Sequence, residues 1–222
     1  MSLISYIKNL ANNLTDFLYP KSAKVLELES LSTDKLWELL PKSVTLEGGD
    51  IIAIFDYSHS LVKEIIWEVK YNGNRVLADK LGEILYDIIV DELEERNVFE
   101  KTSTVTLMPI PISDKRRFER GWNQSELIAD AVKVRDNAGR FKYLPRQLAK
   151  LRHTESQTKT ANKSERKENL RNSMKVLNPL SVQDKYVVLI DDVVTTCSTF
   201  AEARRALKVA GAKRVMCFAI AH

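Results

Sequence analysis

The stretch Tyr186–Gly211, YVVLIDDVVTTCSTFAEARRALKVAG, decides the fold of this chain because its pattern indicates a strand, a loop and a helix in succession. Val187–Ile190 is a continuous apolar run rich in β-branched residues, which is typical of a parallel strand buried on both faces. Two adjacent carboxylates, Asp191 and Asp192, close this run. From Thr199 onward the pattern becomes helical, and Gly211 is placed to end the helix. The expected apolar face of the helix consists of Phe200, Ala203, Ala206, Leu207 and Ala210.

The loop between this strand and helix combines hydroxyl groups with the start of a helix. Ligands of open α/β sheets bind beyond the carboxyl ends of the strands. A helix that begins there points free N–H groups and the positive end of its dipole at the site, which suits a phosphate. The two carboxylates can accept hydrogen bonds from vicinal sugar hydroxyls or bind Mg²⁺. A ribose 5-phosphate would satisfy both halves, whereas the plainer alternative is a polar connection without a ligand. The hydroxyls belong to Thr195, Thr196, Ser198 and Thr199.

Asp191–Thr199 resembles the 5-phosphoribosyl 1-pyrophosphate (PRPP) motif of type I phosphoribosyltransferases. The resemblance implies that the two acids are the catalytic residues, that they hold the ribose hydroxyls, and that they bind Mg²⁺ directly or indirectly. The family usually has glycine at the position of Cys197, where glycine permits positive φ and close approach of the backbone to phosphate. The residues implied to bind ribose and 5-phosphate are Asp191, Asp192, Val193, Val194, Thr195, Thr196, Cys197, Ser198 and Thr199.

Cys197 has two interpretations that the sequence leaves open. A thiol at a helix N-terminus can have a lowered pKa and be reactive. No histidine or second cysteine lies nearby in the sequence, so a small filler residue is the favoured interpretation.

The length of the chain suits one large α/β domain with an appendage. The chain has 222 residues, of which 44% are hydrophobic and 29% are charged, enough for a sizeable core with a charged surface. The net charge of +4 is only mildly basic and is not in itself a signal for nucleic acid. The two cysteines lack metal-ligand spacing, so we expect no zinc and a reducing cytoplasm. The first 20 residues are too polar for a signal peptide or membrane insertion.

Residues 1–47 are predicted to form a helical N-terminal appendage to a phosphoribosyltransferase-like domain at 48–222. Apolar residues recur at helical spacing as far as Leu18, and a second helix is predicted over Thr33–Leu40. These helices have three candidate surfaces on which to pack: their own domain, a second copy in a homodimer, or another partner. Packing on their own domain is the default expectation.

The remaining elements follow from apolar patterns and turn residues. The predicted strands are Asp50–Tyr57, Thr104–Ile112 and Arg214–Ala221, and Cys217 is expected in the core of the last one. One predicted helix is capped by Ser58 or Ser60 and continues through Tyr71. A second runs from Arg75 to Glu95, with a turn at Asn72-Gly73-Asn74 between them.

A second chemical stretch, Ser113–Glu126, follows the strand that ends in Pro109-Ile110-Pro111. It places four cations within six residues on a predicted loop, before a helix capped by Asn123 with Glu126 three residues later. A basic loop at the carboxyl end of a strand suits an anion such as pyrophosphate, and a merely solvated loop is the alternative.

These residues resemble the ComF branch of type I phosphoribosyltransferase-like proteins. The matching patterns are Pro109-Ile110-Pro111 followed by Arg117 and Arg120–Gln124, Lys70–Gly73, and the series from Arg152 through Gln157 and Arg166 to Asn172, so the resemblance covers roughly residues 50–222. ComF proteins commonly begin with a four-cysteine zinc segment, whereas residues 1–45 contain no cysteine. The resemblance implies that pyrophosphate is bound by Arg116, Arg117, Arg120 and Lys70.

Arg152–Ser173 is the most polar stretch of the chain. Long loops without secondary structure in compact domains are usually functional lids or disordered. The resemblance implies a flexible hood loop that closes over substrate, with Arg152 and Gln157 in it. A solvated surface loop is the alternative, and Arg152, Lys159 and Lys163 are also candidates for contacts to substrate phosphates or a nucleic-acid backbone.

We therefore expect an α/β fold, a type I phosphoribosyltransferase-like parallel sheet flanked by helices, with a flexible hood loop and a small helical N-terminal segment. The first functional hypothesis is phosphoribosyl transfer from PRPP to an unknown acceptor with Mg²⁺, although the residues leave open whether turnover occurs. The second, which the resemblance to ComF proteins implies, is a non-catalytic or PRPP-regulated protein that handles single-stranded DNA during DNA uptake in natural transformation, with Trp122 and Phe118 as stacking candidates. The third is a structural role after activity was lost through the change of glycine to Cys197.

Overall fold

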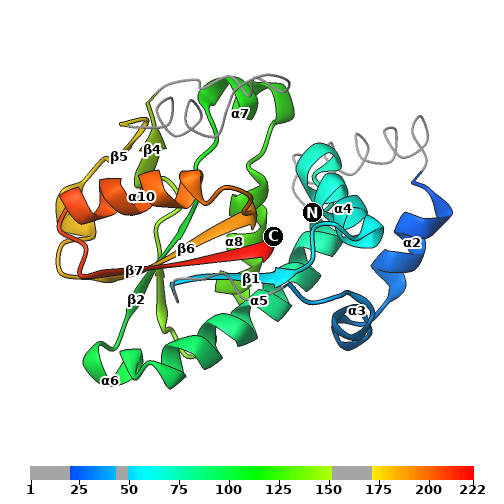
Figure 1. The fold of residues 1–222 in the computed structure, drawn as a ribbon, viewed down its shortest axis with the longest axis horizontal. Helices are drawn as coiled ribbons and strands as arrows, with labels where there is room; N and C mark the ends of the chain where they lie inside the picture. The colour runs from blue at the N-terminus through cyan, green and yellow to red at the C-terminus, as the bar shows by residue number, and fades with distance from the viewer. Residues whose placement is uncertain (1–20, 44–49, 152–171) are drawn as a thin grey trace, which may run out of the picture.

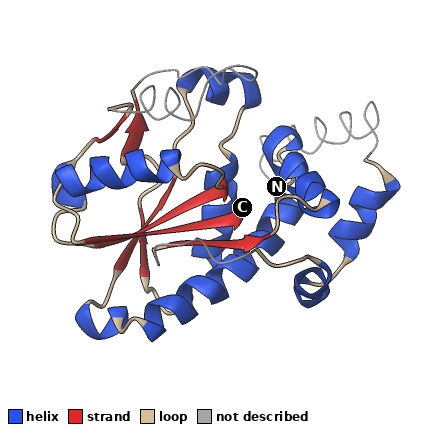
Figure 2. Cartoon of the chain, viewed as in Figure 1, coloured by secondary structure: helices blue, strands red, loops and turns tan. Residues whose placement is uncertain are grey.

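The computed structural model describes residues 21–43, 50–151 and 172–222. Its main sheet contains five parallel strands in the order β1-β7-β6-β2-β3, with helices on both faces (Figures 1 and 2). This confirms the predicted α/β class with a parallel sheet flanked by helices. The helix expected to end at Leu18 and the hood residues Arg152 and Gln157 lie outside the described residues. The strands are β1 (Ile51–Phe55), β2 (Val105–Pro109), β3 (Phe141–Tyr143), β6 (Tyr186–Val193) and β7 (Arg214–Ala221).

The central strands β6 and β7 are buried on both faces, as their continuous apolar sequences predict. Side chains alternate between the faces along each strand. On one face, Val188 and Phe218 pack in a core with α5 (Arg75–Glu95) and α8 (Gln124–Arg135). On the other face, Leu189 and Cys217 pack against α10 (Ser198–Val209), which lies on the opposite side of the strands from α5 (Figure 1). The prediction that Cys217 is a core residue is confirmed.

The other elements are short and surround this three-layer core. Asn74 caps α5 at the predicted turn, and Ser32 caps the helix predicted over 33–40. The helix predicted to continue through Tyr71 instead changes to one turn of π-helix, η1, after Trp67. The prediction that Ser58 or Ser60 caps it is wrong, because the N-cap is His59, which makes no capping hydrogen bond. These elements are α2 (Ala23–Ser30), α3 (Thr33–Leu39), α4 (Ser60–Trp67), η1 (Glu68–Asn72), α6 (Val98–Lys101), α7 (Asp114–Arg120), β4 (Leu148–Lys150), β5 (Met174–Val176) and the 3₁₀ turn η2 (Pro179–Ser181).

The described part of the N-terminal segment packs on the main domain. Leu28 and Leu36 belong to the same buried core as α5. Two hydrogen bonds reinforce this contact, from Asn74 Nδ2 to Glu29 Oε1 at 2.6 Å and from Thr33 Oγ1 to Glu83 Oε2 at 2.8 Å. The default expectation of packing on the chain's own domain therefore holds for residues 21–43, while the division at residue 47 remains a prediction.

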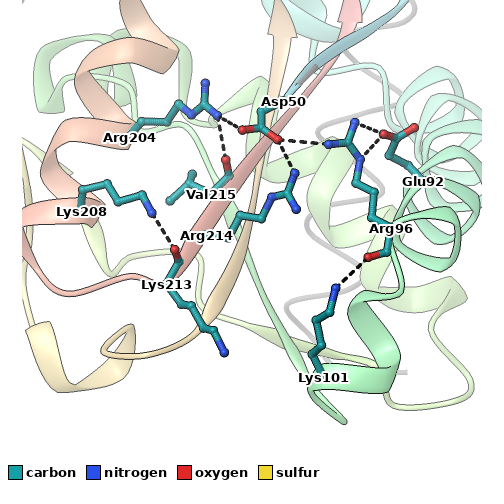
Figure 3. A network of polar contacts seen from close by, with 9 residues as sticks. All are labelled: Asp50, Glu92, Arg96, Lys101, Arg204, Lys208, Lys213, Arg214 and Val215. Carbon is teal, nitrogen blue, oxygen red and sulfur yellow. Dashed lines mark hydrogen bonds and ion pairs between the residues drawn. The ribbon is translucent and has the colours of Figure 1, made fainter. Parts of the chain in front are cut away.

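A charged cluster closes the amino-terminal edge of the sheet (Figure 3). Asp50, just before β1, accepts hydrogen bonds from Arg96 at 3.1 Å and Arg214 at 2.9 Å through Oδ1, and from Arg204 at 2.8 Å through Oδ2. Arg96 follows α5 and also pairs with Glu92, Arg204 lies on α10, and Arg214 begins β7. One carboxylate thus joins both helical layers to the sheet.

None of the helices within the described ranges is long and apolar enough to cross a membrane.

We expect Gly82→Ala to lower the free energy of unfolding by about 2 kcal/mol, although alanine in a helix is intrinsically favoured over glycine by about 1 kcal/mol. A Cβ at Gly82 would lie 2.9 Å from the backbone oxygen of Ile128 and would also clash with the Cβ of Ala131. Because backbone cannot rotate away, α5 and α8 would have to separate. Thermal melts should show a drop of about 4–8 °C, partly recovered in the double variant with Ala131→Gly. An increase in melting temperature would contradict the close packing of these helices.

Candidate functional site

The carboxyl ends of β2 and β6 lie next to each other, and the chain continues from them in opposite directions along the sheet. From β2 the chain continues through α7 and α8 to β3, whereas from β6 it continues through α10 to β7 on the other side. The two strand ends remain adjacent, since Pro109 pairs with Ile190 and the N–H of Ile110 donates to the carbonyl of Ile190 at 2.8 Å. Such a switch point is where open α/β sheets bind their ligands. The predicted acidic motif and the predicted basic stretch are therefore brought to one edge.

The acid pair lies inside β6 rather than after it. The prediction that Asp191 and Asp192 close the strand is wrong, because the ladder with β7 continues through Asp191–Ala219 to Val193–Ala221. Both acids are buried, at 8% and 5% exposure. The hydroxyl of Ser125 on α8 donates to Asp191 Oδ1 at 2.8 Å, and the amide of Gln124 reaches Asp192 Oδ1 at 3.5 Å. The strand and α8 together hold the carboxylates in fixed positions.

Burial and charge repulsion make the two carboxyl groups unequal. Burial, followed by the neighbouring charge of Asp192, raises the pKa of Asp191 well above its usual value, and the hydrogen bond from Ser125 only partly opposes this. The second oxygen of Asp192, Oδ2, is buried without a partner among the described residues. A buried carboxylate oxygen of this kind needs a donor or a cation. The pair therefore fits a sugar hydroxyl or a hydrated Mg²⁺, whereas no described group of three His, Cys, Asp or Glu side chains could by itself hold a metal.

The loop after β6 presents the N-terminus of α10. This helix begins at Ser198, one residue before the predicted Thr199, and Cys197 stands at its N-cap without a side-chain hydrogen bond. The first-turn N–H groups of α10 thus lack a capping side chain. The hydroxyls of Thr196 and Ser198 are 2.9 Å apart at the same point. This arrangement of free N–H groups, hydroxyls and a helix dipole is suited to a phosphate.

Cys197 adopts the left-handed conformation that glycine would favour, with φ 56° and ψ 1°. We expect Cys197→Gly to relieve this strain and raise the free energy of unfolding by about 0.5–1 kcal/mol, which is about 1–4 °C in melting temperature. Cys197→Ala retains the Cβ and should leave the melting temperature almost unchanged, so it separates backbone strain from loss of the thiol. Equal shifts in both variants in calorimetric melts would contradict a strained N-cap.

The basic stretch is a helix rather than the predicted loop. Ser113 caps α7 by accepting a hydrogen bond from the N–H of Arg116 at 3.4 Å, and Gly121 ends it in the left-handed conformation, with φ 81°. The next helix begins as predicted, because Asn123 Oδ1 accepts a hydrogen bond from the N–H of Ser125. Glu126, however, bonds Arg117 instead of completing a capping box. The cations therefore project from a defined helix at the switch point.

The predicted pyrophosphate-binding arginines have different surroundings. Arg117 forms a two-bond ion pair with Glu126, at 2.9 and 2.6 Å, and this hydrogen bonding raises its pKa. It is thereby engaged in joining α7 to α8. Arg116 is half-buried and makes no ion pair with any described residue. Arg120 reaches Gln124 Oε1 at 3.4 Å, so Arg116 and Arg120 have more donor groups available to an anion than Arg117 has.

The Lys70–Gly73 segment packs directly on the Arg120–Gln124 segment. The indole N–H of Trp122 donates to the carbonyl of Val69 at 3.2 Å, next to half-buried Lys70. Gly73 has φ 61°, and a Cβ there would lie 2.9 Å from the Trp122 ring. The structure thus brings together two motifs that lie some 50 residues apart in sequence.

Lys150 is a site residue that the sequence interpretation missed. Burial, then the charge of Arg116, lowers the pKa of Lys150, while the charge of Asp191 opposes this, so the charges of these three residues influence one another. Lys150 ends β4, which pairs with β5. Sequence reasoning had no signal for this residue, because β4 and β5 have only three residues each.

The β4–β5 ribbon that carries Lys150 is fixed to α10. Lys150 pairs with Met174, whose N–H donates to Glu202 Oε1 at 3.1 Å and whose carbonyl accepts from Arg205 at 3.2 Å. Glu202 is buried on α10, the helix whose N-terminus is the candidate phosphate site. The position of Lys150 is therefore tied to that of the loop before α10.

Comparisons with known proteins agree with these motifs, although no family model matches the chain. The DNA utilization protein YhgH of Escherichia coli (strain K12) is 27% identical over 165 residues, covering 74% of this chain and 68% of the relative. Competence protein F of Haemophilus influenzae is 26% identical over 161 residues, covering 71% of this chain and 66% of the relative.

Two solved structures are also similar over 64% of this chain and 25% of theirs, at 18% identity. They are the allosteric regulatory enzyme of purine biosynthesis, with a TM-score of 0.35, and the glutamine PRPP amidotransferase from B. subtilis complexed with ADP and GMP, with a TM-score of 0.36. The curated relatives agree with the resemblance that the motifs predict: this chain is similar in sequence to competence protein F and the DNA utilization proteins.

Proposed function

We propose that this protein binds PRPP at the switch point between β6 and β2 and transfers its phosphoribosyl group to an acceptor. The observation that carries the proposal is the buried pair Asp191–Asp192, with one carboxylate oxygen lacking a described partner, beside the uncapped N-terminus of α10. A sugar that bears a phosphate on one side and hydroxyls on the other would complete both features.

Each part of PRPP has a matching group in this arrangement. The 5-phosphate would take the N–H groups and hydroxyls of the loop Thr195–Thr199, and the ribose hydroxyls would donate to Asp191 and Asp192. The pyrophosphate would meet Arg116 and Arg120 of α7, which follows β2, and Lys70 of η1, which packs against the segment after α7. Guanidinium groups are well suited to phosphate oxygens because they offer paired donors.

Catalysis at such a site would rest on positioning and electrostatics. Holding the ribose at two carboxylates and the phosphate at a helix N-terminus fixes the reacting carbon relative to the acceptor. The arginines would stabilise the charge that develops on departing pyrophosphate, while the carboxylates face the ribose as it gains positive character. Mg²⁺, if held through Asp191, Asp192 and substrate oxygens, would neutralise part of the pyrophosphate charge.

The names of the relatives favour a second candidate function. Proteins named for DNA utilization and competence match about three quarters of this chain. We therefore also propose that the chain handles single-stranded DNA, with PRPP as a ligand or regulator. The two functions are compatible, because a DNA-binding surface can adjoin a phosphoribosyl site.

Titration calorimetry with PRPP, with and without Mg²⁺, tests the first proposal. We expect micromolar binding that depends on Mg²⁺, followed by release of pyrophosphate when the correct acceptor is present. Ribose 5-phosphate is the matched control ligand, since it lacks the pyrophosphate and should bind more weakly and with less dependence on Mg²⁺. The absence of PRPP binding by the unmodified protein would refute the transferase proposal and leave the DNA-handling proposal standing.

A further inference from the structure

Two large aromatic side chains stand exposed next to the candidate site without being part of it. Trp67 at the end of α4 is 52% exposed, and Tyr71 in η1 is 47% exposed. Their ring centroids lie 5.5 Å apart with a tilt of 43°. Aromatic side chains of this size usually bury most of their surface, so an exposed neighbouring pair indicates a binding surface.

Cations flank this aromatic pair. The guanidinium carbon of Arg120 lies 4.9 Å from the centre of the Tyr71 ring, and Lys70 Nζ lies 5.7 Å from it. The nearest acids in the sequence are already engaged: Glu64 pairs with Lys24, and buried Glu68 accepts a hydrogen bond from Asn72 at 2.9 Å. The surface formed by Trp67, Tyr71, Lys70 and Arg120, here called the aromatic surface, thus combines ring faces with positive charge.

Packing against Trp122 fixes η1, the element that carries Lys70 and Tyr71 of the aromatic surface. Trp122 donates its indole N–H to the carbonyl of Val69 in η1 and packs against Gly73, which ends η1 in the left-handed conformation. Asn74 then caps α5 and donates to Glu29 of the N-terminal segment. A surface fixed in this way loses little conformational entropy when a ligand binds.

We propose that the aromatic surface binds single-stranded nucleic acid, with bases stacked on Trp67 and Tyr71 and the adjoining phosphates at Arg120 and Lys70. Exposed ring faces beside cations are the combination that single strands require, because an unpaired base offers its π-face and the backbone its charge. A duplex hides those faces within its own stack. This inference rests on the second proposed function and assigns it a location.

Arg120 links this surface to the phosphoribosyl site. Its Nη1 approaches Gln124 Oε1 at 3.4 Å, and Gln124 Nε2 approaches Asp192 Oδ1 at 3.5 Å. A strand on the aromatic surface therefore lies within two side chains of the carboxylates, and PRPP and DNA will affect each other's affinity to the same degree.

Fluorescence anisotropy with a labelled oligothymidylate tests the proposal. We expect Trp67→Ala and Tyr71→Ala each to weaken binding about ten- to hundredfold, the range for loss of one stacked base. Leu180→Ala is the control, since Leu180 is 75% exposed on η2, which carries no residue of either proposed site, and it should leave the affinity unchanged. Phe118→Ala tests the other stacking candidate, which is 92% exposed on α7 and makes no ring contact with a described residue, and we expect it to weaken binding less than Trp67→Ala does. Arg120→Gln should reduce the slope of log affinity against log salt concentration by about one, the value for loss of one phosphate contact.

Three results would contradict the proposed location of the site or the proposed ligand. An unmodified protein that binds no oligothymidylate, or binds a duplex of equal length as tightly, rules out a single-strand site. If Phe118→Ala weakens binding about ten- to hundredfold and Trp67→Ala does not weaken it, the binding site lies on α7 instead. PRPP calorimetry on Trp67→Ala keeps the two proposals apart: retained PRPP binding shows an intact fold and phosphoribosyl site, whatever happens to DNA binding.

Discussion

PRPP binding will weaken at least about a hundredfold when Asp191 and Asp192 are both replaced by asparagine. Each carboxylate is expected to accept hydrogen bonds from the ribose, and a hydrogen bond to a charged group contributes about 1.5–3 kcal/mol. Loss of two such bonds corresponds to a factor of about a hundred or more in Kd. Calorimetry with PRPP and Mg²⁺ measures this directly. Asp79→Asn is the matched control, because Asp79 is an exposed acid on α5 and its loss should leave Kd unchanged.

The same double substitution should not unfold the protein. Burial and the charge of Asp192 raise the pKa of Asp191, so the folded state holds a proton more tightly than the unfolded chain does. That contribution to stability is present at low pH and is lost as the pH rises above the unfolded value of about 4. The asparagine variant has no carboxyl groups to ionise at these positions, so its stability does not fall in this way as the pH rises. Its melting temperature should therefore exceed that of the unmodified protein at pH 8, and the difference should be smaller at pH 4. A variant that melts much lower at pH 8 would show that its binding defect is a folding defect.

Asp50→Ala is expected to lower the free energy of unfolding by about 3 kcal/mol, the lower end of the range for a broken buried ion pair, because the cluster is partly exposed. Without the carboxylate, Arg204 and Arg214 would lose their acidic partner, while Arg96 would retain its ion pair with Glu92. The melting temperature should fall by about 6–12 °C at neutral pH. The double variant with Arg214→Ala should recover part of the loss, since it removes one uncompensated cation. A loss below about 0.5 kcal/mol in urea denaturation would show that solvent replaces the cluster.

Acid should reproduce part of this effect. Burial alone would raise the pKa of Asp50, but the hydrogen bond and charge of Arg214, with Arg204 and Arg96, outweigh it and hold the pKa below the usual value. The stabilisation from a carboxyl group of this kind is present at neutral pH and is lost as the pH falls below about 4. Stability measured by urea denaturation between pH 6 and 3 should therefore decline more steeply in the unmodified protein than in Asp50→Ala.

The central layers were predictable because their signals are long and continuous. The apolar run before Asp191 and the helical spacing after Thr199 predict β6 and α10, and both are present. The end of β6 was not predictable, because two carboxylates normally terminate a buried strand. Pairing with β7 extends the ladder through both of them. The tertiary partner, absent from the local pattern, decides where the strand stops.

The surroundings of the site were less predictable than its motifs. The helix α7 has its cap at Ser113 and its terminator at Gly121, but it buries none of its residues, so an amphipathic pattern was missing. Lys150 enters the site only because a three-residue strand is fixed to α10 through Met174. Such contacts depend on topology rather than on sequence spacing.

The pairing of β1 with β7 has a consequence for how the chain folds during its synthesis. Ile51 pairs with Cys217 and Phe55 with Ala221. The ribosome therefore adds more than 150 residues after β1 before β7, its partner strand, is synthesised. Until β7 emerges from the ribosome, β1 and β6 both have open edges that invite pairing with other chains. We expect nascent chains stopped before residue 214 to aggregate or to be held by chaperones, and the last strand to set the time at which the native core closes.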